Sequence, residues 1–381
     1  METHTVFERA VTRLSIASCI LGLAASGCAN QTVGFPTVTN SYVFAQTVAI
    51  PGVPPSGGWQ VGFGVVDQAD GVYVLADRST AGVDVVRLSD LTFLRVAGHG
   101  SFAGNRVTPA HSAGPNSVTA VGNGVVFASD GNSNIVVVDV NTGATLGNVV
   151  VPNTGSTTNR VDLLGYDPKD KIVLAGNDSA TPAPVVTFVS TVAPYPVLGQ
   201  IFLTNATGGV EQPTYDPAQG VFLLAVPSTT ANPSGEIDVI NPTTRAIVKV
   251  FPVSGNCLPT GTDLGPNEEL AVSCSNVPSG SQVLNATTGA SLATIPAANG
   301  CDQVWYNPSD NRFYYACSHD TTGSAATPLV AIVDASSFQT ITTIPTAASS
   351  NTVAVDAATN HVFIPERSGK GPLGLDVFAY L

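Results

Sequence analysis

The sequence predicts an all-β fold, specifically a seven-bladed β-propeller built from four-stranded antiparallel blades. Three observations indicate this fold: a four-strand unit between Asp302 and Pro345, the return of its turns at nearly regular spacing, and a C-terminus that leaves the last unit one strand short. Self-similarity at a fixed period is typical of repeat architectures. We therefore expect a ring of similar sheets rather than a layered domain.

The clearest unit contains four short strands, which we call A to D. Strand A covers residues 304–306 and is followed by the turn Asn307-Pro-Ser-Asp310; strands B, C and D cover 313–317, 330–334 and 339–345. Alternating or apolar runs separated by turn residues are typical of antiparallel hairpins. The unit is therefore expected to form a meander.

The second strand of this unit recurs along the chain at blade-sized spacing. Six intervals span 362 − 72 = 290 positions, which is roughly 48 residues each and lies in the range of propeller blades. Each B strand follows a turn of Asp, Asn, Gly or Pro residues. The seven B strands begin near Val72, Val125, Ile172, Val221, Leu270, Phe313 and Val362.

The two chain ends predict how the ring closes. Several D strands end on an apolar residue and proline, as at Ile295-Pro296 and Ile344-Pro345, and one more copy, Ile50-Pro51, precedes the first A strand. The chain stops inside the C strand of the seventh unit, at 375–380. We expect residues 42–50 to supply the missing outer strand, because closure removes an exposed sheet edge.

The N-terminus has the pattern of an export signal. Arg9 and Arg13 precede an apolar run at 14–25, which is too short for a standard membrane span and ends at Ser26-Gly27-Cys28. This end resembles the cleavage box of bacterial lipoproteins, whose cysteine becomes the lipidated first residue; ordinary signal cleavage nearby is the alternative. We expect a signal peptide at 1–27, lipid on Cys28, a tether at 28–40 and one domain at 41–381.

The charge balance excludes one class of partner. The formal net charge is −13, and it stays −13 after cleavage because the leader carries two acidic residues, Glu2 and Glu8, and two basic residues. Such a chain is repelled by phosphate backbones and anionic lipid surfaces. We expect no nucleic-acid partner, membrane contact only through the lipid, and a monomer in the periplasm or cell envelope.

Four cysteines remain once Cys19 is removed with the leader and Cys28 is assigned to lipid. Cys257 and Cys301 open A strands, and Cys274 and Cys317 end the B strands of the same two blades. The start of one strand lies opposite the end of the next in a hairpin, so Cys257 with Cys274 and Cys301 with Cys317 are expected neighbours. An oxidising exterior favours disulfides; a metal site of four thiolates is the alternative.

The repeat resembles a known family. Strands such as Gly124-Val-Val-Phe127 and Gly71-Val-Tyr-Val74, turns such as Asn141-Thr-Gly143, and strands ending in Ile-Pro are similar to the YVTN-type seven-bladed propellers of exported bacterial proteins. More distantly, the chain resembles gluconolactonase and regucalcin propellers. The likeness covers residues 41–381 and implies the architecture, whereas function depends on the particular site.

Candidate binding residues follow from propeller geometry, in which the A strands line the central channel. The D-to-A and B-to-C connections share one face, where ligand sites usually lie. The loops after the B strands add Asp77-Arg78, Asp130, Asn177-Asp178, His319-Asp320 and Glu366-Arg367 to the rim of that face. The residues that we expect at the channel mouth are Trp59, Asn116, Arg160, Glu211, Gln212, Asp302 and Gln303.

Two functions from different classes fit these candidates. Oxygen ligands converging on one axis suit a hard cation such as calcium, and gluconolactonase-like propellers hold such an ion, so Asn116, Asn159, Glu211 and Asp302 are candidate ligands. The chain would then be a metal-dependent hydrolase or lyase acting on a lactone or sugar derivative. The preferred hypothesis is a non-enzymatic module that binds a protein, glycan or small molecule. These side chains could alternatively cap strands and hold water.

The N-terminal pattern predicts a specific covalent modification. Metabolic labelling with a radioactive fatty acid is expected to label the full-length chain and to leave a Cys28→Ala variant unlabelled, because the thiol of Cys28 is the expected acceptor. An unlabelled wild-type chain that is nevertheless exported would instead indicate ordinary signal cleavage.

Overall fold

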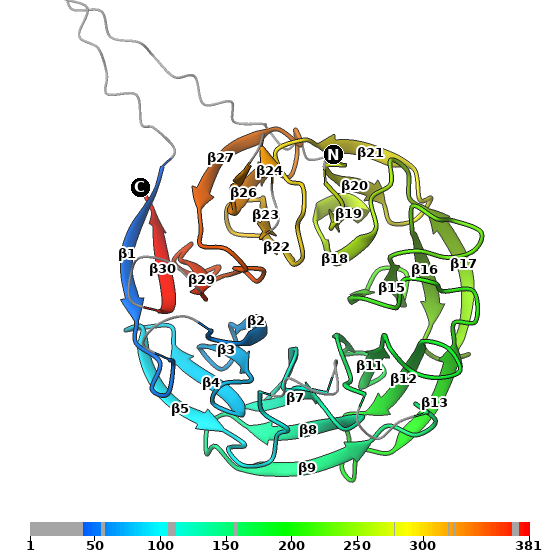
Figure 1. Cartoon of the computed structure of the whole chain (residues 1–381), viewed down its shortest axis with the longest axis horizontal. Helices are drawn as coiled ribbons and strands as arrows, with labels where there is room; N and C mark the ends of the chain where they lie inside the picture. The colour runs from blue at the N-terminus through cyan, green and yellow to red at the C-terminus, as the bar shows by residue number, and fades with distance from the viewer. Residues whose placement is uncertain are drawn as a thin grey trace, which may run out of the picture. The chain divides into compact units, whose positions relative to one another are not determined.

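The computed structural model describes residues 41–54, 58–105, 112–155, 159–277, 279–318, 321–322, 325–367 and 373–381. The signal peptide, Cys28 and the tether lie outside these residues. The described part of the chain from Ser41 to Leu381 forms seven four-stranded antiparallel sheets arranged in a ring (Figure 1), which confirms the predicted seven-bladed propeller. No helix in this described part is long and apolar enough to cross a membrane.

The first four blades follow the chain in order, with the first strand of each lying nearest the axis and the fourth at the rim (Figure 1). Their strands are β2 (Val61–Asp67), β3 (Val72–Asp77), β4 (Gly82–Arg87) and β5 (Thr92–Ala97); β6 (Val118–Gly122), β7 (Val125–Asp130), β8 (Asn134–Asp139) and β9 (Thr145–Val150); β10 (Leu164–Asp167), β11 (Ile172–Asn177), β12 (Val185–Ser190) and β13 (Val197–Phe202); and β14 (Pro213–Asp216), β15 (Val221–Val226), β16 (Glu236–Asn241) and β17 (Ala246–Pro252).

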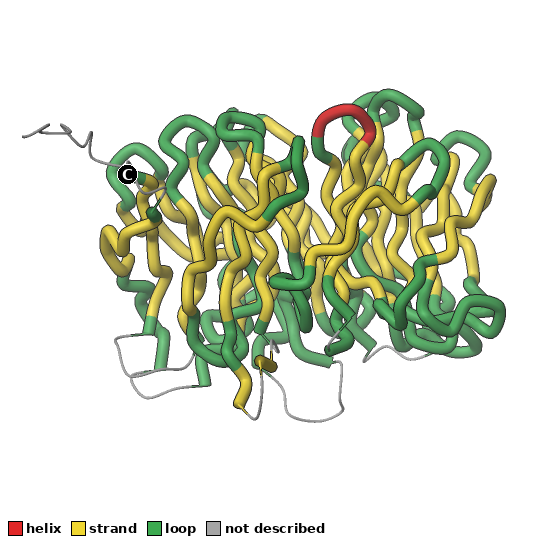
Figure 2. The backbone as a smooth tube through the Cα atoms, turned by 90° about the horizontal axis from the view of Figure 1, so that it is seen from above, coloured by secondary structure: helices red, strands yellow, loops and turns green. Residues whose placement is uncertain are grey.

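The last three blades include the one that joins the two ends of the chain. Their strands are β18 (Pro259–Leu264), β19 (Glu269–Cys274), β20 (Ser281–Asn285) and β21 (Ser291–Ile295); β22 (Val304–Asn307), β23 (Arg312–Cys317), β26 (Leu329–Asp334) and β27 (Thr340–Pro345); and β28 (Ala354–Val355), β29 (Val362–Glu366), β30 (Gly374–Tyr380) and β1 (Tyr42–Val48). The side view shows strands running between two faces of loops (Figure 2).

Ring closure takes the form that the sequence predicts. Strand β1 pairs antiparallel with β30, from Tyr42 opposite Tyr380 to Val48 opposite Leu375. The Tyr42 hydroxyl also lies 2.7 Å from the hydroxyl of Tyr314 in the sixth blade, and Arg312 donates a hydrogen bond to it at 2.6 Å. The N-terminal strand is therefore held by the neighbouring blade as well as by its own.

Local turn chemistry explains the regularity of the blades. The Oδ1 atom of Asp67, at the end of β2, accepts hydrogen bonds from the backbone N–H groups of Ala69 and Asp70, at 3.1 and 3.2 Å. Asp167 and Asp216 make the equivalent pairs of bonds at the ends of β10 and β14. An aspartate side chain can satisfy a tight turn in this way, so the repeated Asp positions specify where each inner hairpin reverses.

The hydrophobic core lies between adjacent blades. Val74 and Val85 of the first blade pack in one buried cluster with Val126 and Val136 of the second. At the closing junction, the ring of Tyr73 stacks on that of Phe363 with centroids 4.9 Å apart. Because both faces of each sheet are covered by a neighbouring blade, the central strands are apolar almost throughout.

Glycines let the inner strands of neighbouring blades touch at the backbone. The N–H of Phe63 donates to the carbonyl of Asn116 at 2.8 Å, and the N–H of Gly261 donates to that of Asp302 at 2.8 Å. A β-carbon on Gly62 would lie 1.7 Å from the Asn116 oxygen, and one on Gly261 would lie 2.2 Å from the Asp302 oxygen. These contacts fix the positions of Asn116 and Asp302 around the axis.

The structure differs from the predicted strand pattern in three places. The first inner strand begins at Val61, whereas the run of strand-like residues in the sequence begins at Trp59, so Trp59 and Gln60 precede the strand. The turn before β19 contains a short 3₁₀ helix, Pro266–Glu268, which its Gly-Pro-Asn sequence did not indicate. The loop after β23 contains an extra strand pair, β24 (Thr321–Thr322) and β25 (Ala325–Ala326), which its polar sequence did not indicate.

Both predicted disulfides are present. Cys257 is bonded to Cys274 and Cys301 to Cys317, each pair linking the first two strands of one blade. All four cysteines are buried. The disulfides indicate an oxidising compartment, because such bonds rarely persist in a reducing cytosol.

Removal of one disulfide is expected to destabilise the fold measurably. Replacing both Cys257 and Cys274 by alanine is expected to lower the free energy of unfolding by about 3 kcal/mol, the magnitude for a cross-linked loop of this length. Urea unfolding followed by tryptophan fluorescence measures the change. Wild-type protein under strong reductant is the control, and a difference below about 0.5 kcal/mol would contradict a structural role for the bond.

Candidate functional site

A polar cavity of about 410 Å³ opens at one end of the central channel. It lies where the first strand of each blade begins and where the second strand ends. Propeller geometry predicts a site at this face. Small-molecule sites fall in this size range, at its lower end. The side chains and backbone around it belong to Gly62, Phe63, Arg78, Asn116, Arg160, Asp162, Leu163, Glu211, Thr260, Ser275, Cys301, Asp302 and Asn351.

Four of the predicted site residues line this cavity together: Asn116, Arg160, Glu211 and Asp302. They come from the starts of four different blades, and no two are adjacent in the sequence. Asp162, which was not among the predicted residues, contacts two of them, Arg160 and Asn116. Its position two residues after Arg160, just before β10 begins, was the available signal.

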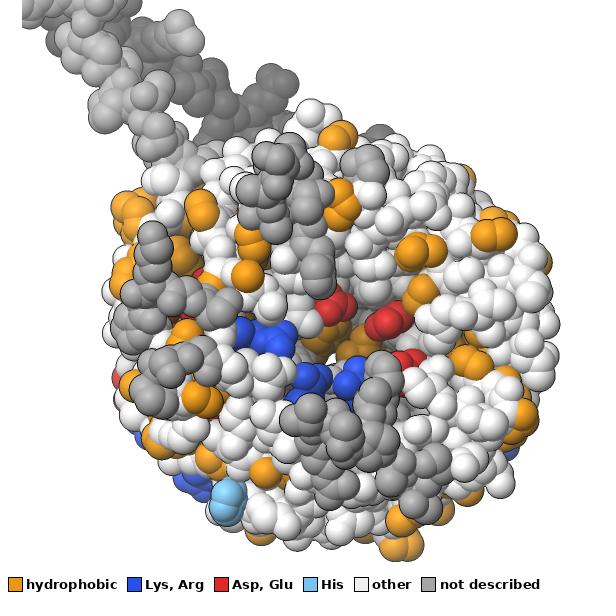
Figure 3. Space-filling view, viewed as in Figure 1, with side chains coloured by type: hydrophobic (Ala, Val, Ile, Leu, Met, Phe, Trp, Pro, Cys, Tyr) orange, Lys and Arg blue, Asp and Glu red, His pale blue; other side chains and the backbone are white. Residues whose placement is uncertain are grey.

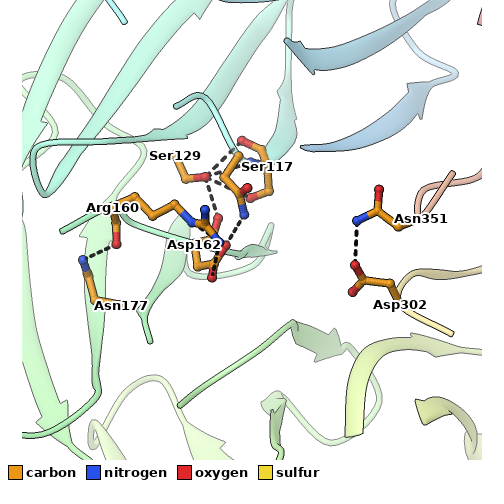
Figure 4. A network of polar contacts seen from close by, with 8 residues as sticks. Ser117, Ser129, Arg160, Asp162, Asn177, Asp302 and Asn351 are labelled. Atoms are coloured by element: carbon orange, nitrogen blue, oxygen red, sulfur yellow. Dashed lines mark hydrogen bonds and ion pairs between the residues drawn. The ribbon is translucent and has the colours of Figure 1, made fainter. Parts of the chain in front are cut away.

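Asp162 holds two of the predicted residues in place (Figure 4). Its Oδ1 and Oδ2 atoms accept hydrogen bonds from Nε and Nη2 of Arg160, both at 3.3 Å, and its Oδ1 accepts another from the side-chain amide of Asn116. The Ser129 hydroxyl donates to the Asp162 backbone carbonyl. Charge-assisted pairs of this kind are strong where water is excluded, so Arg160 is largely committed to the protein.

A second network lies across the mouth from the first (Figure 4). The Nδ2 atom of Asn351 donates to Oδ2 of Asp302 at 2.7 Å. The Oδ1 atom of Asn351 accepts a hydrogen bond from Arg367 at 3.0 Å. Arg367 also donates to the carbonyls of Trp59 and Ser349 and to the side chain of Gln60. Arg367 therefore fastens the seventh blade to the first.

Trp59 is placed differently from what we expected. Its indole is fully buried in the core between the first and seventh blades, and Nε1 donates to Oδ2 of Asp77 at 2.7 Å. Only its backbone carbonyl reaches the mouth, through Arg367. An aromatic residue at the start of an inner strand can point to either side, and sequence alone did not distinguish them.

Gln212 and Gln303 lie deeper in the channel than the other predicted residues. They line a separate cavity of about 190 Å³. The amide of Gln303 donates to the carbonyl of Gly64 at 3.2 Å, and its oxygen accepts from the N–H of Val353 at 3.1 Å. Gln212 accepts from the N–H of Thr262 at 3.2 Å. Both amides therefore link inner strands of different blades.

Of the four residues predicted to bind a divalent cation, Asn116, Glu211 and Asp302 line the cavity and Asn159 does not. The side chain of Asn159 donates to the backbone carbonyl of Ser179 at 2.8 Å and does not line the cavity. Asn116 presents its NH₂ group to Asp162, and a cation requires oxygen ligands. Within the described residues, no group of three His, Cys, Asp or Glu side chains is placed to hold a metal ion.

Arg78 is the least satisfied cation at the mouth. Its Nε atom is shielded from solvent, and its guanidinium makes no hydrogen bond or ion pair with the described residues. Burial and the nearby charges of Arg160 and Arg367 lower the pKa of Arg78 to about 10. It still carries its charge at neutral pH, so the site contains a positive group whose donors the protein does not use.

Glu211 is the acidic residue at the mouth whose side chain, like that of Arg78, lacks a hydrogen bond to the described part of the chain. Its carboxyl makes no hydrogen bond or ion pair with the described residues, although it lines the cavity with Asp162 and Asp302. Burial raises the pKa of Glu211 well above its ordinary value, and repulsion from Asp162, Asp302 and Asp178 raises it further. Desolvation and like charge both favour the protonated form.

Comparisons with known proteins support the fold and give no function. No protein-family model matches the sequence, and no curated protein sequence is significantly similar to it. A chain in a crystal structure of the mitotic checkpoint complex has a similar structure, with a TM-score of 0.65 and 12% sequence identity. The alignment covers 94% of this chain and 99% of that one. At this identity the likeness shows a shared architecture alone.

The raised pKa of Glu211 predicts a pH-dependent stability. The unfolded carboxyl titrates near its ordinary value of 4.5, and the folded one titrates higher. The contribution of Glu211 to stability is therefore complete below about pH 4.5 and is lost as pH rises through the raised folded pKa. Glu211→Gln is expected to flatten this part of the profile and to be more stable than wild type at pH 8.

Urea unfolding midpoints measured between pH 4.5 and 8 test this expectation. Asp90→Asn removes a carboxylate whose side chain is about half exposed and pairs with Arg87 on the surface, so it is the control. Other buried carboxyl groups give the wild type a slope of their own, so the comparison is between variants. Equal slopes in Glu211→Gln and wild type would contradict the assignment.

Proposed function

We propose that this chain is an exported, lipid-anchored β-propeller that binds a small ligand at the mouth of its channel without transforming it chemically. The observation that carries the proposal is the cavity of about 410 Å³ lined by two charged or ionisable groups, Arg78 and Glu211, whose side chains make no hydrogen bond with the described residues. Buried polar groups are normally hydrogen-bonded. Groups that are not, in a concave site, suit a ligand that completes them.

The disulfides and the N-terminal pattern support export. Two disulfides suit an oxidising compartment, and the leader with Cys28 fits lipid attachment. A propeller anchored by its N-terminus is attached next to β1, the strand that completes the ring. In this proposal the rigid ring presents its cavity outside the cytoplasm.

Binding receives more support than the alternative, a metal-dependent lactone hydrolase or lyase. That reaction needs a cation held by several oxygen atoms near the substrate. Of the candidate ligands, Asn159 makes a loop contact outside the cavity and Asn116 donates its NH₂ group to Asp162, so Glu211 and Asp302 are the two that line the cavity without such a contact to Ser179 or Asp162. Around the cavity, Arg78 and Arg160 add positive charge that opposes a bound cation.

The binding proposal predicts a ligand-dependent signal that requires Arg78. Saturation-transfer NMR with separate mixtures of hexoses, dicarboxylic acids and short peptides is expected to show contact for at least one class. Arg78→Gln is expected to weaken that signal about tenfold or more in affinity, because it removes charge-assisted hydrogen bonds. Arg87→Gln, which alters an arginine exposed on the first blade, is the matched control and is expected to leave the signal intact.

Two outcomes would contradict this function. One is the absence of contact with any of the three mixtures at millimolar concentration. The other is a contact that Arg78→Gln and Arg87→Gln reduce equally, which would locate binding away from the channel mouth.

A further inference from the structure

The charges around the channel mouth form a basic group and an acidic group, which meet where Arg160 pairs with Asp162. Basic side chains gather on one side of the central opening, and acidic ones gather on the facing side (Figure 3). The basic group consists of Arg78, Arg160 and Arg367, which lie close enough for Arg160 and Arg367 to lower the pKa of Arg78. The acidic group consists of Asp162, Glu211 and Asp302.

Most of these charged groups form hydrogen bonds or ion pairs within the described part of the protein, but one basic group and one acidic group do not. Arg160 is paired with Asp162, and Arg367 donates four hydrogen bonds to the seventh and first blades. Asp302 accepts from Asn351. Arg78 and Glu211 line the same cavity but do not pair with each other, so in the described residues each sign has one group with unused hydrogen-bonding capacity.

A ligand of one charge would satisfy only half of this arrangement. An anion at Arg78 would relieve the repulsion among the three arginines, but it would leave Glu211 beside Asp162 and Asp302. A cation at Glu211 would relieve the repulsion among the acids, but it would add to the positive charge that faces Arg78. Like charges at these separations in a partly desolvated site oppose each other strongly. A ligand that carries both charges relieves both groups at once.

The wall between the two groups is partly apolar. Phe63 and Leu163 line the cavity together with the charged residues, and each is almost completely shielded from solvent. Thr260 and Ser275 add hydroxyl groups to the wall. An aliphatic or peptide-like segment between two charged ends fits such a surface better than a fully hydroxylated sugar.

We propose that the ligand of the channel mouth is a small zwitterion, whose anionic group is bound by Arg78 and whose cationic group is bound by Glu211. The inference rests on the binding function proposed above and adds the chemical class of the ligand. An amino acid or a short peptide with free ends has this chemistry. The cavity, at about 410 Å³, accommodates a few residues and excludes a folded chain.

Binding of such a ligand is coupled to a proton. The bound cation favours the ionised form of Glu211, whose pKa is raised in the free protein. Glu211 therefore releases a proton when the zwitterion binds at a pH between its ordinary and raised pKa values. The heat of binding then depends on the ionisation enthalpy of the buffer, which gives a readout independent of affinity.

A matched series of tripeptides tests the proposal. Trialanine carries both end charges, N-acetyltrialanine carries only the anion, and trialanine amide carries only the cation. Isothermal titration calorimetry of the mature chain is expected to show trialanine binding at least about tenfold more tightly than either capped form, since each cap removes one charge-assisted contact. Proton release, measured in two buffers, is expected for trialanine and trialanine amide only.

Two substitutions test which residue binds the anionic end of the peptide and which binds the cationic end. Arg78→Gln is expected to reduce the affinity for trialanine and N-acetyltrialanine without reducing that for trialanine amide. Glu211→Gln is expected to do the reverse and to abolish proton release. Arg87→Gln is expected to match wild type with all three peptides. The melting temperature of each variant without ligand shows whether it is folded.

The results distinguish this inference from the binding function itself. Equal affinity for the three peptides, or binding that depends on one charge only, would overturn the zwitterion assignment. No tripeptide binding together with saturation transfer to hexoses or dicarboxylic acids would overturn the ligand class and retain the binding function. No contact with any probe would overturn both.

Discussion

The pairing of β1 with β30 is the interaction on which the rest of the structure depends. A propeller blade is stable only when both of its faces are covered, and in a ring this requires the first and last blades to meet. Residues 42–48 supply the outer strand of the seventh blade, and Tyr42 reaches further to Tyr314 and Arg312 of the sixth.

Without this closure, β30 would present an unpaired edge, and the stacking of Tyr73 on Phe363 would lose the blade that supports it. The same closure brings Arg367, near the end of the chain, to the carbonyl of Trp59, near its beginning. The channel mouth is therefore assembled only when the ring is complete.

The charged groups at the channel mouth lower the stability of the folded protein. A buried charge without a partner disfavours the folded state, and the pKa values of Arg78 and Glu211 are shifted in the directions that burial and like charge produce. Elsewhere the same protein satisfies similar groups carefully, as with Asp162, which accepts from both Arg160 and Asn116. Such local exceptions are typical of functional sites in otherwise consistent folds.

Much of the fold was predictable because its determinants are local. Asp67, Asp167 and Asp216 each form a turn with residues two or three positions later, so the turns could be recognised from short stretches of sequence. The two disulfides join residues 17 and 16 positions apart across single hairpins. The strand pair β24–β25 was missed because it lies in a polar loop without an alternating pattern.

The candidate site was predictable as a set of positions but not as a set of contacts. The starts of the inner strands indicated Asn116, Arg160, Glu211 and Asp302, and these four residues line one cavity. The buried indole of Trp59 and the loop contact of Asn159 depend on which way a side chain turns at the edge of a strand. Residues in neighbouring blades decide that direction, and the local sequence does not show which residues these are.

The sequence by itself determined the number of blades, the order of their strands and the strand that closes the ring, and it indicated which cysteines are neighbours. These properties follow from turn residues, periodicity and counting, all of which act over one hairpin or one repeat. Only the tertiary structure decided which charged groups at the mouth form hydrogen bonds within the described part of the protein and which do not. Asn116 meets Asp162 across 46 positions and Arg367 meets Gln60 across 307; contacts between such distant residues depend on the twist and close approach of neighbouring blades.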